Sequence, residues 1–163
     1  MSVSMKDAVR LVRNVLDENH YRYRYDEDKD IFLISFNLNK TKLGSTDIRI
    51  MIRASSEDPS CCQRIMSYGG ISMKADQDCM AQVCEFLTRA NYGLALGNFE
   101  MDLSDGEILY KVGINAKDAL PGDDAVDDLT ALPVAMFNRY GNGLLSVMMG
   151  MCSAEEAIRK IEG

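Results

Sequence analysis

Three stretches in the first third of the chain alternate apolar and polar side chains with a period of two, and this pattern constrains the fold more than any other feature. The stretches are residues 21–25, 31–38 and 48–53. Such alternation is typical of strands that bury one face of a sheet and expose the other. Short polar segments at 26–30 and 39–45 separate the stretches, so neighbouring strands are expected to run antiparallel.

Further strands are expected later in the chain. Residues 61–71 fit a fourth strand better than a helix, although the sequence leaves both assignments open. Residues 97–102 and 107–114 are expected to form a hairpin, because Ser104, Asp105 and Gly106 between them include a glycine that accepts the positive φ of a tight turn.

Two amphipathic helices are expected to flank these strands. Residues 4–18 place apolar side chains at helical spacing, and Ser4 with Asp7 forms a capping pattern. Residues 76–91 show the same spacing, with Asp76 predicted as the N-cap.

The end of the chain also reads as helical. An apolar stripe over residues 126–151 predicts a helix of about seven turns, which Pro133 must kink or split and Gly150 must end. Ser153 and Glu156 form an S-x-x-E capping box that opens a short final helix.

The order of these elements predicts an α+β fold. We expect an antiparallel sheet of five to six strands, flanked by helices in the order α-β-β-β(-β)-α-β-β-α-α. No linker or internal repeat interrupts residues 1–163, so the chain is expected to form a single domain.

Composition narrows the function and the compartment. The net charge of -7 disfavours nucleic acid as a partner, and a single histidine disfavours multi-histidine metal sites. The five cysteines lack CxxC spacing and are expected to be reduced packing residues. Residues 1–19 carry charges every few positions, unlike a signal peptide or a membrane span, so a cytoplasmic location is expected.

A motif in the second half carries a family resemblance. Residues 87–102, LTRANYGLALGNFEMD, are followed by Asp105, Gly106 and Tyr110. This stretch resembles the YbjN family of bacterial sensory transduction regulators, and the region from Tyr140 through Gly150 and Ser153 to Glu155-Glu156-Ala157 is similar to the tail of some relatives. The resemblance implies a type III secretion chaperone-like fold, often homodimeric, and implies no catalytic residue or cofactor.

The turn chemistry of this motif has a structural interpretation of its own. Asn91 is predicted to be a left-handed C-cap, with Gly93 letting the chain leave the helix. Gly97 is predicted to allow a close approach where the next strand begins.

Four arginines form a first candidate surface, comprising Arg22, Arg24, Arg49 and Arg53. If their strands share a sheet, all four lie on its outward face, where they would bind an acidic partner segment or an anionic ligand. The alternative is a solvated face with cross-strand pairs to Asp or Glu. Residues 1–75 carry 12 basic and 10 acidic side chains, whereas residues 76–163 carry 6 and 15, so the chain is also electrically polar.

The methionine-rich stripe is a second candidate surface. Methionine adapts to irregular apolar contacts, which suits a core helix, a dimer seam or a promiscuous groove. The apolar partner or dimer surface predicted there comprises Met136, Phe137, Tyr140, Leu144, Val147, Met148 and Met151.

Two smaller features favour structural roles. The acidic group Asp123, Asp124, Asp127 and Asp128 is better explained by the helix dipole than by a bound cation. His20 is expected to stabilise the end of the first helix.

These observations predict a non-enzymatic, chaperone-like module that binds protein or acts as a regulatory adaptor, as a cytoplasmic homodimer. Its partners would be a second copy and a protein segment, with no nucleic acid, membrane, metal or cofactor. The alternative is a domain that senses a small anion on a basic sheet face.

Overall fold

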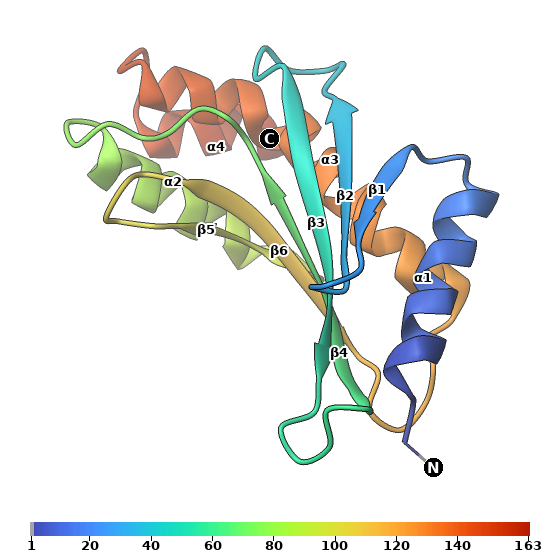
Figure 1. Ribbon diagram of the computed structural model, residues 1–163. Coiled ribbons are helices and arrows are strands. Elements are labelled where there is room, and N and C mark those ends of the chain that lie inside the picture. Colours follow the sequence, from blue (N-terminus) through green and yellow to red (C-terminus); the bar gives the residue numbers. More distant parts are fainter. Residues whose placement is uncertain (1) are drawn as a thin grey trace.

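The computed structural model describes residues 2–163 as a six-stranded antiparallel sheet with four helices (Figure 1). The elements are α1 (Met5–Glu18), β1 (Tyr23–Asp26), β2 (Ile31–Asn37), β3 (Ser45–Ala54), β4 (Cys62–Gly70), α2 (Met80–Tyr92), β5 (Asn98–Met101), β6 (Ile108–Asn115), α3 (Asp123–Met148) and α4 (Ala154–Glu162). The strand order is β1-β2-β3-β4-β6-β5. The predicted α+β class, the element order and the fourth strand are therefore confirmed.

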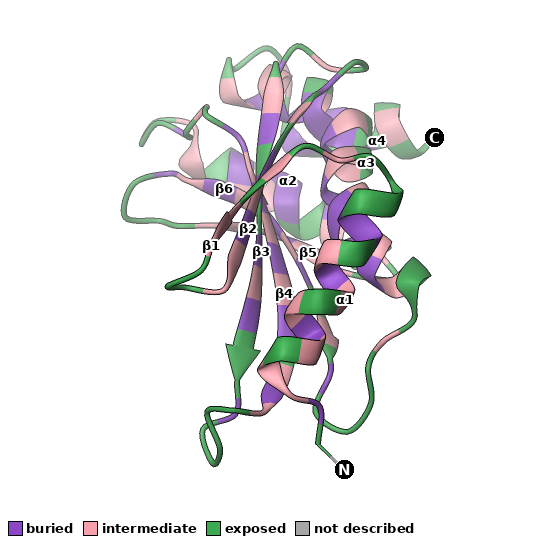
Figure 2. Cartoon of the chain, turned by 45° about the vertical axis from the view of Figure 1, so that its right-hand side comes forward, coloured by how far each residue is buried: buried purple, intermediate pink, exposed green. Residues whose placement is uncertain are grey.

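The helices cover one face of the sheet and leave the other face open. α3 packs against β3, β4 and β6, α1 packs beside it, and α2 lies along β5 and contacts both α3 and α4. Alternate residues of the strands point into this layer, among them Phe32, Ile50, Ile65 and Tyr110, which are fully buried. The residues between them stay partly or fully exposed, as Figure 2 shows along the strands.

Local signals in the sequence set several element boundaries. The Ser4 hydroxyl accepts a hydrogen bond from the Asp7 N–H, and the capping box of Ser153 and Glu156 is complete, so both predicted caps are confirmed. Gly106 has φ of +74° in the hairpin, as its turn requires. The predicted N-cap at Asp76 is wrong, because its carbonyl accepts the Cys79 N–H in a preceding turn and α2 begins only at Met80.

The YbjN-like motif closes one edge of the sheet. Asn91 lies inside α2, so its prediction as a left-handed C-cap is wrong. Its side-chain amide instead donates to the Phe99 carbonyl at 2.9 Å and accepts the Phe99 N–H at 2.7 Å. Asn91 thereby pairs the free backbone N–H and carbonyl of Phe99 on the outer edge of β5, as a neighbouring strand would.

Gly97 confirms the predicted close approach. Its φ is +73°, and a Cβ atom there would lie 2.6 Å from the hydroxyl of Tyr110. That hydroxyl donates to the Leu96 carbonyl, so the aromatic ring and the start of β5 occupy the space that a side chain would need.

Pro133 neither splits nor ends α3, which runs unbroken from Asp123 to Met148. A proline at this position cannot donate to the carbonyl of Leu129, four residues earlier. The hydroxyl of Ser67 on β4 donates to that carbonyl at 2.5 Å. The proline ring packs where β4 has no side chain, since a Cβ at Gly69 would lie 2.5 Å from the Pro133 Cβ.

Three tyrosines hold the edge strand β1 and its approach against the rest of the chain. The hydroxyls of Tyr21, Tyr23 and Tyr25 donate to the carboxylates of Asp127, Asp17 and Asp30, respectively. Burial and these neighbouring carboxylates raise the pKa of each phenol, that of Tyr25 to about 12. The tyrosines whose alternation predicted the strand therefore also connect β1 and its approach to α1 and α3.

Candidate functional site

The open face of the sheet is the best candidate for a functional site, because strand pairing gathers side chains on it from five strands. Arg24 on β1 lies opposite Leu33 on β2, and Leu33 lies opposite Arg49 on β3. The same row continues through Tyr68 on β4 to Lys111 on β6. Since paired residues share a face, this row places three cations around two apolar groups.

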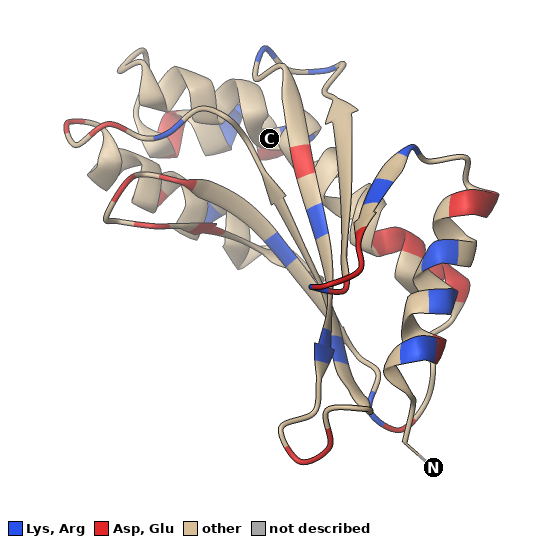
Figure 3. Cartoon of the chain, in the orientation of Figure 1, with Lys and Arg blue, Asp and Glu red and all other residues tan. Residues whose placement is uncertain are grey.

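Two further arginines lie next to one another lower on the same face. Arg53 on β3 is directly opposite Arg64 on β4, and both are exposed. Like charges in this position repel one another. Figure 3 shows positive charge in the middle of β3 and of β6 and in the lower parts of β3 and β4.

The structure therefore brings only three of the four predicted arginines onto the open face. Arg24, Arg49 and Arg53 lie on the open face, whereas Arg22 is exposed but precedes β1 and lies outside the sheet. Arg64 and Lys111 join the group. Sequence reasoning missed them because it favoured a strand over residues 61–71 without examining which side chains faced outward, and because it did not order the strands. The alternation of Arg64, Met66 and Tyr68 with buried Ile65 and Ser67 is the signal that could have found the first of them.

Most of these cations have no acidic partner. Within residues 2–163, Arg24, Arg49, Arg53 and Arg64 form no ion pair, and only Lys111 is paired, with Glu100. Apolar side chains lie between them, and those that are partly exposed are Ile31, Leu33, Met51, Met66, Tyr68 and Leu109. The open face thus combines apolar surface with guanidinium groups that are free to bind carboxylates or phosphates.

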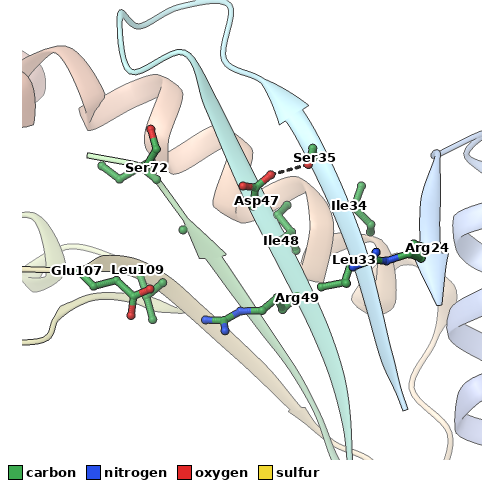
Figure 4. A pocket seen from close by; sticks show the side chains of 12 residues that line it. Arg24, Leu33, Ile34, Ser35, Asp47, Ile48, Arg49, Ser72, Glu107 and Leu109 are labelled. Atoms are coloured by element: carbon green, nitrogen blue, oxygen red, sulfur yellow. Dashed lines mark hydrogen bonds between the residues drawn. The ribbon is translucent and has the colours of Figure 1, made fainter. Parts of the chain in front are cut away.

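A hollow of about 420 Å³ lies in the upper part of the open face (Figure 4). Its lining comprises Arg24, Leu33, Ile34, Ser35, Asp47, Ile48, Arg49, Gly70, Ile71, Ser72, Glu107 and Leu109. Gly70 is paired with Asp47 on one side and Leu109 on the other, so the absence of a side chain there opens the space between them. The Asp47 carboxylate accepts a hydrogen bond from the Ser35 hydroxyl on β2.

The methionine-rich stripe is mostly core. Phe137, Tyr140, Leu144 and Val147 are buried beneath the sheet and neighbouring helices, so they are not surface residues of this chain. Met136 and Met148 are partly buried against the same core. Met151 is 71% exposed, and Met149, which the sequence reasoning did not include in the surface, is 64% exposed. The exposed apolar part of this region is therefore confined to the end of α3 and the turn after it.

The other sequence candidates have structural contacts. Asp123 and Asp124 open α3, as the dipole interpretation expects, and Asp127 accepts the Tyr21 hydroxyl. No group of three His, Cys, Asp or Glu within residues 2–163 is arranged to hold a metal ion. His20 follows α1 with φ of +57°, and its N–H donates to the Asp17 carbonyl.

The five cysteines are free thiols, as expected. Cys62 is fully buried, and this burial raises the pKa of its thiol, which therefore stays neutral. A neutral buried thiol is a poor nucleophile.

Comparison with known families agrees with this arrangement. The model of the YbjN family, described as a putative bacterial sensory transduction regulator, matches residues 8–146. The chain belongs to the YbjN family. The match spans all six strands and most of α3, so it includes the whole open face of this YbjN protein and leaves α4 outside. A search of curated proteins found no match. Among the described residues of this YbjN protein, no helix is both long enough and apolar enough to cross a membrane.

Proposed function

We propose that this YbjN protein is a non-enzymatic, cytoplasmic regulatory adaptor that binds an acidic protein segment on the open face of its sheet. The observation that carries the proposal is a sheet face on which Arg24, Arg49, Arg53 and Arg64 are exposed and unpaired around partly exposed apolar side chains. A segment that alternates apolar with acidic residues would cover the apolar groups and neutralise the guanidiniums.

The charge of the whole protein supports selectivity for such a segment. The chain has a net charge of -7, so the protein as a whole repels an acidic partner, whereas the cationic face attracts it. The unfavourable pairing of Arg53 with Arg64 is relieved when a carboxylate binds between them. The family description as a sensory transduction regulator is compatible with an adaptor role.

Site-specific photo-cross-linking tests the proposal. A cross-linker replaces Met66 on the open face in one variant and Arg159 on α4 in another, both in cells of the source organism. We expect the Met66 probe alone to capture a partner, whose cross-linked peptide is acidic by mass spectrometry. The Arg53→Glu/Arg64→Glu variant should lose this product, and the control variant Arg159→Glu/Lys160→Glu should retain it. Equal capture from both probes, or capture that survives the Arg53→Glu/Arg64→Glu change, contradicts the proposal.

The chaperone-like fold and the homodimer are a second part of the proposal and rest on the family resemblance. Light scattering should give about twice the chain mass of 18.2 kDa. Met149 and Met151 are the large exposed apolar residues nearest the predicted dimer surface. Met149→Asp/Met151→Asp should therefore shift the protein toward the monomer, and a monomeric wild-type protein rejects the dimer.

A second candidate function is the sensing of a small ligand in the hollow. It is favoured by the hollow itself, whose volume of about 420 Å³ is in the range of small-molecule sites and whose lining includes Arg24 and Arg49. A ligand present at 100 times its Kd would stabilise the fold by about 2.7 kcal/mol. A thermal-shift screen of carboxylates and phosphates, repeated with Arg49→Ala, tests this function.

A further inference from the structure

One row of residues on the open face is entirely apolar. Ile31 on β2 lies opposite Met51 on β3. Met66 on β4 lies opposite Met51 on one side and opposite Gly113 on β6 on the other. A Cβ atom at Gly113 would lie 2.8 Å from the Met66 Cε, so the Met66 side chain extends over β6 at this point. These four residues form an apolar band that crosses four adjacent strands, and all four are partly or fully exposed.

Cationic rows flank the apolar band on both sides. On the side toward the hollow, two residues along the strands, lie Arg24, Arg49 and Lys111. On the opposite side, again two residues along the strands, lie Arg53 and Arg64. We call these the upper row and the lower row.

The arginine side chains stay beside the band. Figure 4 shows Arg24 extending from β1 toward β2 and Arg49 extending across β4, so both follow the upper row from strand to strand. In the lower row the Arg53 Nη2 donates to the Met51 sulfur at 3.7 Å, at the edge of the band. No arginine of either row belongs to an ion pair within residues 2–163. Each flank of the band therefore offers guanidinium groups that can bind carboxylates.

The separation of the two rows matches the width of an α-helix. Arg49 and Arg53 are four residues apart on β3, so the rows are about 13 Å apart at the rise of a strand. An α-helix with its side chains is about 10–12 Å wide and fits between them. The band spans three strand spacings, about 14 Å, which corresponds to about ten helical residues or three turns.

A helix also satisfies its own backbone, for which the open face offers no partner. Each of the strands that carry the band lies between two other strands, so its backbone N–H and C=O groups pair within the sheet. An extended segment can therefore add to the sheet only at an edge, whereas a helix bonds internally and can lie on the face.

We propose that the acidic segment that docks on the open face is an amphipathic α-helix of about three turns that lies across the strands. Its apolar side chains contact the band, and acidic side chains on both flanks of its apolar stripe contact the upper and lower rows. Apolar and acidic residues of this segment therefore alternate at helical rather than strand spacing. A second copy docked face to face is disfavoured, because it would oppose arginines to arginines. This proposal rests on the proposed function and specifies its partner.

Fluorescence anisotropy with labelled peptides tests the proposal. The first peptide, of about 18 residues, carries leucine at helical spacing with glutamate on both flanks of the leucine stripe. The second has the same composition with leucine and glutamate alternating at a period of two, and the third is the first with proline at its centre. We expect the helical peptide to bind at least about tenfold more tightly than either of the others, and its helical circular dichroism to increase on binding.

Variants of the two rows test the geometry. Arg24→Gln/Arg49→Gln and Arg53→Gln/Arg64→Gln should each weaken binding of the helical peptide by about tenfold, because each removes the charged partners of one flank. The matched control Arg159→Gln/Lys160→Gln on α4 should leave its binding unchanged. Circular dichroism of each variant establishes that it is folded.

The outcomes separate the helix from the proposed function. If the alternating or the proline peptide binds as tightly as the helical one, the helix is refuted and docking of an acidic segment is retained. If only one arginine pair contributes, a helix lying between the two rows is refuted. If no peptide binds, cross-linking from Met66 decides. A captured acidic peptide with helical apolar spacing supports the helix, and one without it refutes the helix alone. No captured peptide refutes the helix and the proposed function together.

Discussion

Ser67→Ala should destabilise the protein because this hydroxyl allows Pro133 to lie inside α3. The hydroxyl is buried and donates to the carbonyl of Leu129, which has no helical donor because residue 133 is proline. Removing it leaves a buried carbonyl unsatisfied, at a cost of about 1–3 kcal/mol. We expect a loss in the free energy of unfolding within this range, measured by urea denaturation with an unchanged m-value.

A double-mutant cycle tests the reason for this loss. In Pro133→Ala the alanine N–H can donate to Leu129, so Ser67→Ala should cost less in that background than in the wild type. A coupling free energy of about 1 kcal/mol is expected, as for one hydrogen bond. If Ser67→Ala costs the same in both backgrounds, Ser67 does not act by replacing the missing N–H, and the explanation of the unbroken helix is refuted.

Three further predictions concern the packing of other elements. The Thr130 hydroxyl is buried without a hydrogen-bond partner in the described chain. Thr130→Val should therefore raise the urea midpoint by the equivalent of about 1 kcal/mol. A lower midpoint would show that the hydroxyl has a favourable contact. Asn91→Ala should cost about 1–2 kcal/mol and, by opening the edge of β5, cause self-association that rises with concentration in sedimentation velocity; a monodisperse and fully stable variant would contradict this. Burial, and after it Asp30, raise the pKa of the Tyr25 phenol from 10.0 to about 12, so the folded state favours the neutral form. The stabilisation of the fold that results is complete below pH 10 and is lost as the pH rises toward 12. Tyr25→Phe should therefore lose less stability than the wild type between pH 10 and 12 in thermal melts, and equal losses would count against the assignment.

The hollow and the arginine cluster could be foreseen only in part. The period-two pattern placed Arg24, Arg49 and Arg53 on outward positions because parity along a strand is a local property. Their neighbours depend on strand order and register, which are long-range properties. Arg64 becomes the neighbour of Arg53 only through the pairing of β3 with β4, and Glu107 reaches the hollow only because β6 lies next to β4.

The methionine-rich stripe also shows that a local pattern does not predict long-range packing. Helical periodicity correctly gave one apolar side to the segment, but it does not say what covers that side. In the structure the sheet and the other helices of the same chain cover Phe137 and Leu144, which leaves Met149 and Met151 exposed.

The amino-acid sequence by itself determined every strand except β4, for which it only favoured a strand over a helix. It also determined the β5–β6 turn and the caps at Ser4 and Ser153, because each of these features depends on residues within a few positions of one another. The order of the elements then gave the class of the fold. Tertiary structure alone decided how Pro133 is accommodated, what Asn91 binds and which charges meet in the hollow. The partner of the Leu129 carbonyl lies 62 residues away, and that of the Asn91 amide lies across a turn. Both contacts form only when separate elements of the fold pack against one another, and the helical and strand periodicities do not encode them.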